Sequence, residues 1–183
     1  TLDVYKCIWN NNGNPSTIKP TGSLTSIFTT ADGYKWKFMY TIGAADALKF
    51  VTTNWIPVKR ISVDDGSSQW TVQQAAVSGT IDACVMTNQG TGYVSVPAVT
   101  ITGDGTGATA TAVISGGAVT SVIINNPGSG YTYATITIDA PSAGVTATAR
   151  AVFSPQGGHG KDAMTELGAF YVMSNITLAY DEG

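Results

Sequence analysis

The sequence predicts a mainly β or α+β fold: an antiparallel, β-sandwich-like body with a few short helices, and a small two-repeat β module inserted into it. Three observations lead to this prediction. The 183 residues include 26 threonines, a β-branched type that suits strands better than helices. The 21 glycines separate short segments in which apolar and polar residues alternate. A segment of about 37 to 38 residues also occurs twice.

The composition excludes several classes of protein. Charged residues make up 11% of the chain and hydrophobic residues 43%, which excludes a disordered chain or a coiled coil. The net charge is −3, and the nine lysines and arginines are spread along the chain, so no basic stripe predicts a nucleic-acid partner. No apolar run approaches the roughly 18 residues of a membrane span, so we expect no membrane partner either.

The first 80 residues predict strands and two short helices. Residues 34–40 alternate aromatic residues with lysine, as an antiparallel strand with one solvated face does. Residues 44–50 predict a helix, with Asp46 near the end where the helix dipole favours a negative charge. Residues 68–77 predict a second helix. All four tryptophans lie in this part, and we expect them to serve either the core or an interface: Trp9, Trp36, Trp55 and Trp70.

The repeat consists of two similar copies. Residues 81–93 align with residues 119–131, and residues 107–112 align with residues 144–149. Each copy predicts a strand, a Gly-x-Gly-Tyr turn, a second strand, a glycine-rich turn, and a strand that alternates small apolar residues with threonine. We expect the turn residues of the two copies to hold equivalent structural positions: Gly92 and Tyr93 in the first, Gly130 and Tyr131 in the second.

These boundaries predict two units. Residues 81–153 form the inserted β module, and residues 1–80 and 154–183 together form one α+β or β-sandwich body. Within the second part of the body, residues 163–168 predict a helix and residues 170–180 a strand.

The segment GGHGKD at residues 157–162 invites functional interpretations, and none holds. A phosphate-binding loop requires serine or threonine where Asp162 stands. The calcium-binding pattern GGxGxD is present only once, whereas such sites share ligands between tandem copies. His159, the only histidine, has no serine or cysteine at a recognisable nucleophile elbow. We therefore interpret three glycines as a structural turn: Gly157, Gly158 and Gly160.

Other glycine-rich turns also lack a catalytic or cofactor signature. Residues 105–110 match the loose dinucleotide pattern GxGxxA, but the residues that follow alternate as a strand where that site needs a helix. No acid/base pair, nucleophile or metal cluster is evident, so we expect no catalytic residue, metal site or cofactor and no enzymatic activity. The tyrosines of the two Gly-x-Gly-Tyr turns could instead stack on sugars, which leaves a carbohydrate-binding or receptor-binding module as the alternative function.

Three segments of the predicted body resemble the baseplate wedge proteins of contractile-tailed phages of the T-even type. They are YKCIWNNNGNPST at residues 5–17, followed by KPTG at residues 19–22; ADGYKWKFMYTI at residues 31–42; and GGHG at residues 157–160 with ELGA at residues 166–169. The resemblance implies a β-rich, non-catalytic structural subunit of the virion that is assembled in the host cytoplasm. It also implies a homodimer, as the full-length protein, that joins other wedge proteins in the tail baseplate.

Two features depart from this family. Its members are longer than 183 residues, and this chain begins inside a predicted strand without methionine and ends directly after another, so we expect a fragment. The repeat at residues 81–153 differs from the family pattern and resembles modules scattered through phage structural proteins. The resemblance therefore implies a role for the body and none for the module.

Overall fold

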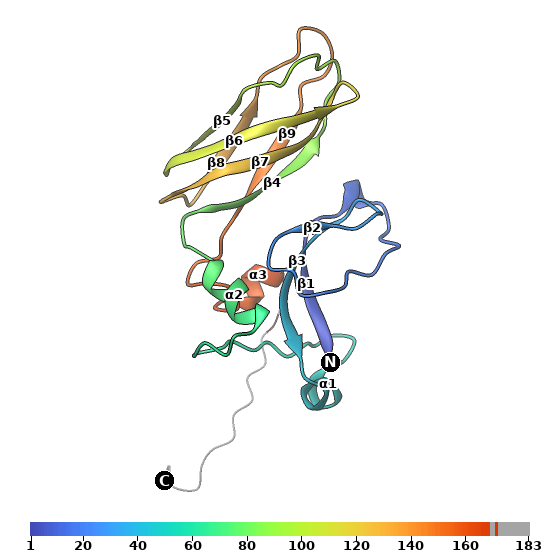
Figure 1. The fold of residues 1–183 in the computed structure, drawn as a ribbon, viewed down its shortest axis with the longest axis vertical. Helices are drawn as coiled ribbons and strands as arrows, with labels where there is room; N and C mark the ends of the chain where they lie inside the picture. The colour runs from blue at the N-terminus through green and yellow to red at the C-terminus, as the bar shows by residue number, and fades with distance from the viewer. Residues whose placement is uncertain (169–170, 172–183) are drawn as a thin grey trace, which may run out of the picture.

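The computed structural model describes residues 1–168 and Tyr171, and it confirms a mainly β fold with antiparallel sheets and few short helices (Figure 1). The helices lie where the sequence predicts them: α1 (Ala44–Phe50), α2 (Ser68–Ala75) and α3 (Ala163–Leu167), with one 3-10 turn, η1 (Asn11–Gly13). The strand predicted at residues 170–180 lies outside the described residues.

The body contains one antiparallel sheet with the strand order β1-β3-β2: β1 (Leu2–Trp9), β3 (Lys35–Ile42) and β2 (Phe28–Thr29). In the part of the body that the structure describes, the expected sandwich-like packing is not found, because helices rather than a second sheet cover β3 (Figure 1). α2 packs against β3, and Leu167 at the end of α3 packs against a small core of Met39, Tyr40 and Ile42.

β3 lacks the solvated face that its alternating aromatic residues and lysines predict. Lys37, Phe38, Met39 and Tyr40 are all buried. The Nζ atom of Lys37 lies 2.8 Å from the Oδ2 atom of Asp82, at the start of the module, so the lysine is covered rather than solvated. The prediction was wrong because an alternating pattern shows the polarity of the side chains. It does not show which distant part of the chain packs over them.

Asp32 organises the long loop between β1 and β2. Its Oδ2 atom accepts hydrogen bonds from Ser16 Oγ (2.9 Å) and from the backbone N–H groups of Thr17 (2.9 Å) and Ile18 (3.0 Å). Its Oδ1 atom accepts a hydrogen bond from Thr30 Oγ1. These bonds, that of Thr30 first, hold the pKa of the Asp32 carboxyl well below its usual range. The carboxylate thereby ties the loop that follows β1 to the turn before β3.

Within residues 1–168, the strands of the module pair only with one another. They form a four-stranded sheet, β4-β9-β8-β5, and a two-stranded sheet, β6-β7. Side chains of both sheets share one apolar core, so the two-layer packing of this protein lies in the module (Figure 1). The strands are β4 (Ile81–Asn88), β5 (Val99–Gly103), β6 (Thr106–Ser115), β7 (Ala118–Ser129), β8 (Ala134–Ile138) and β9 (Thr148–Phe153).

The two copies of the repeat are interleaved rather than stacked. The first copy supplies β4, β5 and β6, and the second supplies β7, β8 and β9. Each of the three longest ladders of the module joins strands of different copies: β4 with β9, β5 with β8, and β6 with β7. In addition, β4 lies against β7 and β5 against β6, so exchanging the two copies leaves the pattern of neighbours unchanged. Neither copy can complete these sheets alone.

The turn tyrosines hold matching, buried positions in this arrangement. The backbone N–H of Tyr93 donates to the carbonyl oxygen of Gly117 (3.0 Å), and that of Tyr131 donates to the carbonyl oxygen of Gly79 (3.0 Å). Tyr93 is 4% exposed and Tyr131 is 5% exposed. A ring enclosed in this way cannot stack on a sugar, so the hypothesis that these tyrosines form carbohydrate platforms is wrong.

The turn glycines make the first testable prediction. Gly92 has φ +84° and Gly130 has φ +75°, and a Cβ at Gly92 would lie 1.8 Å from the carbonyl oxygen of Ala143, whereas at Gly130 it would meet no atom closer than 3.9 Å. We expect Gly130→Ala to lower the free energy of unfolding by about 1 kcal/mol through backbone strain alone. Gly92→Ala should lower it further because of the added clash. Urea denaturation measures both, and a Gly92→Ala variant as stable as Gly130→Ala would contradict this account.

The positions of the two ends of the module lead to the second testable prediction. Ile81 pairs with Phe153, and the backbone N–H of Ser154 donates to the carbonyl oxygen of Thr80 (3.0 Å), so the chain enters and leaves the module at adjacent points. We predict that deleting residues 81–153 and joining the ends with a short Gly-Ser linker leaves a body that unfolds cooperatively. Thermal and urea unfolding, followed by tryptophan fluorescence, test this. A non-cooperative transition would show that the body depends on the module for its fold.

Candidate functional site

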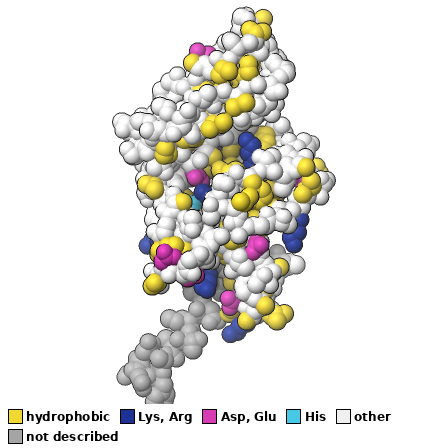
Figure 2. All heavy atoms as spheres, viewed as in Figure 1, with side chains coloured by type: hydrophobic (Ala, Val, Ile, Leu, Met, Phe, Trp, Pro, Cys, Tyr) yellow, Lys and Arg dark blue, Asp and Glu magenta, His cyan; other side chains and the backbone are white. Residues whose placement is uncertain are grey.

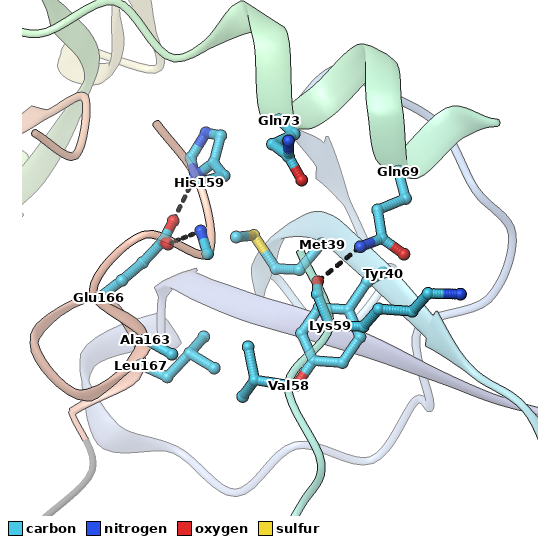
Figure 3. Close-up of a pocket in the computed structure, with 11 residues that line it drawn as sticks. Met39, Tyr40, Val58, Lys59, Gln69, Gln73, His159, Ala163, Glu166 and Leu167 are labelled. Atoms are coloured by element: carbon cyan, nitrogen blue, oxygen red, sulfur yellow. Dashed lines mark hydrogen bonds and ion pairs between the residues drawn. The ribbon is translucent and has the colours of Figure 1, made fainter. Parts of the chain in front are cut away.

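The glycine-rich loop and α3 lie against β3 and α2 around a buried histidine–glutamate pair. Nδ1–H of His159, in the glycine-rich loop, donates a hydrogen bond to Oε1 of Glu166 on α3 (Figure 3). The backbone N–H of Gly160 donates to Oε2 of the same carboxylate (2.9 Å). Both side chains of the pair are almost fully buried, so the carboxylate is held by protein donors in place of water.

Local sequence explains how the loop and the helix reach this arrangement. Asp162 caps α3, because its carboxylate accepts hydrogen bonds from the backbone N–H (3.1 Å) and Oγ1 (2.7 Å) of Thr165. α3 ends at Gly168, whose φ of +69° is left-handed. The loop before α3 turns back sharply through three predicted turn residues with positive φ: Gly157 (+75°), Gly158 (+91°) and Gly160 (+81°).

The electrostatics of the pair keep the carboxylate charged. Burial removes water from Glu166 and acts to raise its pKa, but the hydrogen bonds from His159 and Gly160, and the nearby charges of His159 and Lys6, lower it by more. The pKa of Glu166 is therefore below its ordinary value. Tyr40 faces the same region, and burial together with the charge of Glu166 raises the pKa of its hydroxyl to about 12.

Two glutamines of α2 line the opposite wall of this region (Figure 3). The side-chain amide of Gln73 accepts a hydrogen bond from the backbone N–H of Ile61 (2.9 Å). The same amide donates a hydrogen bond to the carbonyl oxygen of Ile61 (2.6 Å). One helical turn earlier, Gln69 donates to the carbonyl oxygen of Lys59 (2.6 Å). The two amides thus hold the extended segment after α1 against α2, as a neighbouring strand would.

The enclosed space between these walls is too small for a substrate. Its volume is about 10 Å³, which is room for about one water molecule. The hydroxyl of Tyr40 and the Nε2 atom of His159 are buried without a hydrogen-bond partner in the described residues. A site of this size can orient and stabilise the loop and α3, but it cannot admit a reactant.

No metal site is found in residues 1–168 or at Tyr171. These residues contain no group of three or more histidine, cysteine or acidic side chains that could hold a metal ion. Burial raises the pKa of the Cys84 thiol to about 11, so this thiol stays protonated near neutral pH. None of the helices in this described part is long and apolar enough to cross a membrane.

The four tryptophans divide between partial burial and exposure. Trp9, Trp36 and Trp70 are half-buried, and Trp55 is 37% exposed. Trp36 stacks on Tyr34, with ring centroids 5.4 Å apart and an interplanar angle of 15°. No tryptophan belongs to the fully buried core, so each presents part of an indole ring to solvent.

No family model, curated protein or solved structure matches the chain. The site therefore has to be interpreted from its own geometry.

Sequence reasoning missed the roles of Glu166 and of the Lys37–Asp82 ion pair. Glu166 lies seven residues after His159 and makes its contact only because the glycine loop reverses direction. Asp82 does carry a signal, since the matching position of the second copy is Thr120. A charge present in only one copy marks the strand that faces the body.

Acid unfolding makes a third testable prediction. The Glu166 carboxyl has a lower pKa in the folded chain than its ordinary value of 4.5, so its stabilisation is complete above that value and is lost as the pH falls through the folded pKa. We expect Glu166→Gln to lower the free energy of unfolding by about 1 to 3 kcal/mol at neutral pH and to reduce its loss in acid. Urea denaturation between about pH 3 and pH 7 measures both.

The comparison with wild type isolates Glu166, because other carboxyls with lowered pKa values contribute to the acid slope of both proteins. One of them is Asp104. Hydrogen bonds from Thr132 and Tyr133 lower the pKa of its carboxyl to about 2. Asp46→Asn, in the exposed first turn of α1, is the control and should change little. An identical acid slope in wild type and Glu166→Gln would contradict the charged, hydrogen-bonded state of Glu166.

Proposed function

We propose that the chain is a structural subunit of a phage tail baseplate wedge, which self-associates and joins neighbouring baseplate proteins. The supporting observation is that the segments resembling that family, which are far apart in the sequence, pack together in one body. Tyr5, in the first segment, packs edge-to-face on Phe38 in the second, with ring centroids 6.0 Å apart. Leu167, in the third, packs against the core that contains Tyr40. A resemblance carried by residues that contact one another is consistent with a shared fold.

The surface chemistry supports an assembly role. Few charged side chains interrupt the surface, so contact with a neighbour would require little desolvation of ions (Figure 2). α1 and the segment that follows it carry several exposed large apolar side chains: Leu48, Trp55, Ile56, Val58 and Val63. We propose that these residues, here named the α1 face, contact a neighbouring wedge subunit.

The buried histidine–glutamate pair has a positioning role in this proposal, since it holds the loop of residues 157–160 against the body. No catalytic step, cofactor, nucleic acid or membrane is part of the proposed function. The location that the proposal requires is the virion, with assembly in the host cytoplasm.

A pull-down tests the proposal. The full-length protein is co-expressed with the other products of its gene cluster, and we expect it to retain at least one baseplate protein. Leu48→Glu, at a residue 92% exposed on the α1 face, should reduce that retention by about tenfold or more, since it places a charge in an apolar contact. Val94→Glu, at a module residue 90% exposed, is the matched control and should leave retention unchanged.

Two results would contradict the proposal. Retention of no baseplate protein would argue against the function itself. Equal effects of Leu48→Glu and Val94→Glu would argue against the α1 face as the contact surface.

A further inference from the structure

An open groove lies where the end of β1 faces the end of β4, between the body and the module. Its volume is about 340 Å³, within the roughly 300 to 1,000 Å³ typical of small-molecule sites. The groove is lined on the body side by Trp9 and Asn12, and on the module side by residues 86–89. The groove is separate from the buried histidine–glutamate pair.

The lining of the groove is polar but carries no charge. Its lining residues are Trp9, Asn12, Met86, Thr87, Asn88 and Gln89, of which Met86 is buried in the module core. Neither an anionic nor a cationic ligand finds a counter-charge among these side chains. A neutral ligand that offers many hydrogen-bonding groups fits this chemistry.

The three amides are exposed to solvent, and described protein groups use little of their hydrogen-bonding capacity. The side chains of Asn12 and Gln89 make no hydrogen bond with any described residue, and Asn88 uses only its Oδ1 atom, which accepts from the backbone N–H of Gly90 (2.8 Å). Each free amide offers both a donor and an acceptor, and sugar hydroxyls require both. The half-buried indole of Trp9 adds a flat apolar surface, on which the C–H face of a pyranose ring can stack.

The body wall of the groove is preformed. Asn11 and Asn12 have φ values of +48° and +57°, a conformation that is uncommon for residues other than glycine. Asn11 is held in it by a hydrogen bond from its Nδ2 atom to the carbonyl oxygen of Asp32 (2.9 Å). Asparagine tolerates this left-handed conformation, so the hydrogen bond of Asn11 helps to fix the turn that carries Asn12, and a rigid wall costs less entropy on binding.

The second copy of the repeat provides an internal comparison. There, Thr87, Asn88 and Gln89 correspond to Asn125, Asn126 and Pro127, and Asn126 makes the same turn hydrogen bond, accepting from the backbone N–H of Gly128 (3.0 Å). None of these second-copy residues lines the groove. The shared turn is therefore structural, and the groove depends on Trp9 and Asn12 of the body, which line it together with first-copy residues alone.

We propose that this groove binds a neutral oligosaccharide. A pyranose ring stacks on the indole of Trp9, and its hydroxyl groups hydrogen-bond to the amides of Asn12 and Gln89. The lining holds no pair of carboxylates, which glycoside hydrolysis ordinarily requires, so the groove binds the sugar without cleaving it.

Calorimetric titration of the 183-residue chain tests this proposal. The probes are four neutral oligosaccharides (cellohexaose, maltohexaose, mannohexaose and chitohexaose) and the anionic oligogalacturonate. We expect at least one neutral probe to bind with Kd below about 1 mM and oligogalacturonate to bind more weakly. Trp9→Ala and Gln89→Ala should each weaken binding of that probe by about tenfold or more.

Two matched variants serve as controls. Tyr133→Ala removes an exposed aromatic ring that does not line the groove, and Asn125→Ala changes the second-copy residue that corresponds to Thr87, so both should bind as wild type does. Gln89 is an exposed turn residue, so its variant remains folded and decides the outcome even if Trp9→Ala unfolds. The proposal is overturned if no neutral probe binds, if binding survives Gln89→Ala unchanged, or if oligogalacturonate binds best. None of these outcomes bears on baseplate assembly.

Discussion

The pairing of strands between the two repeat copies is the constraint on which the rest of the module depends. Because β4 pairs with β9, the first and last strands are neighbours, and the chain leaves the body and returns to it at almost the same point. Because β6 pairs with β7 and β5 with β8, both sheets draw residues from both copies, and one core forms between them. The same pairing of strands between the two copies buries Tyr93 and Tyr131 at matching positions.

Several of the few charges of this protein lie where separate segments of the chain meet. Lys37 forms an ion pair with Asp82 between the body and the module. Glu166 accepts a hydrogen bond from His159 in the glycine-rich loop, and Asp32 accepts hydrogen bonds from the loop that follows β1. A buried ion pair adds little net stability compared with an apolar pair of the same shape, but breaking it leaves an uncompensated charge. Such pairs therefore affect which segments pack together more than they affect the stability of the fold.

The two proposed surfaces of the molecule use different chemistry. The α1 face offers exposed apolar side chains, which suit a protein neighbour in a dense assembly. The groove beside Trp9 offers an indole and unpaired amides, which suit a hydrated, neutral ligand. A subunit with both surfaces could occupy its place in an assembly and still present the groove to solvent.

Features encoded within short windows of sequence were predictable. The helix at residues 44–50 and the positive φ of the glycines in the two glycine–tyrosine turns follow from local backbone preference. The pairing of β4 with β9, the covered lysine of β3 and the contact of His159 with Glu166 do not. These depend on residues many positions apart that come together only when the chain is folded, and no local pattern records which partner a strand or a charge will find.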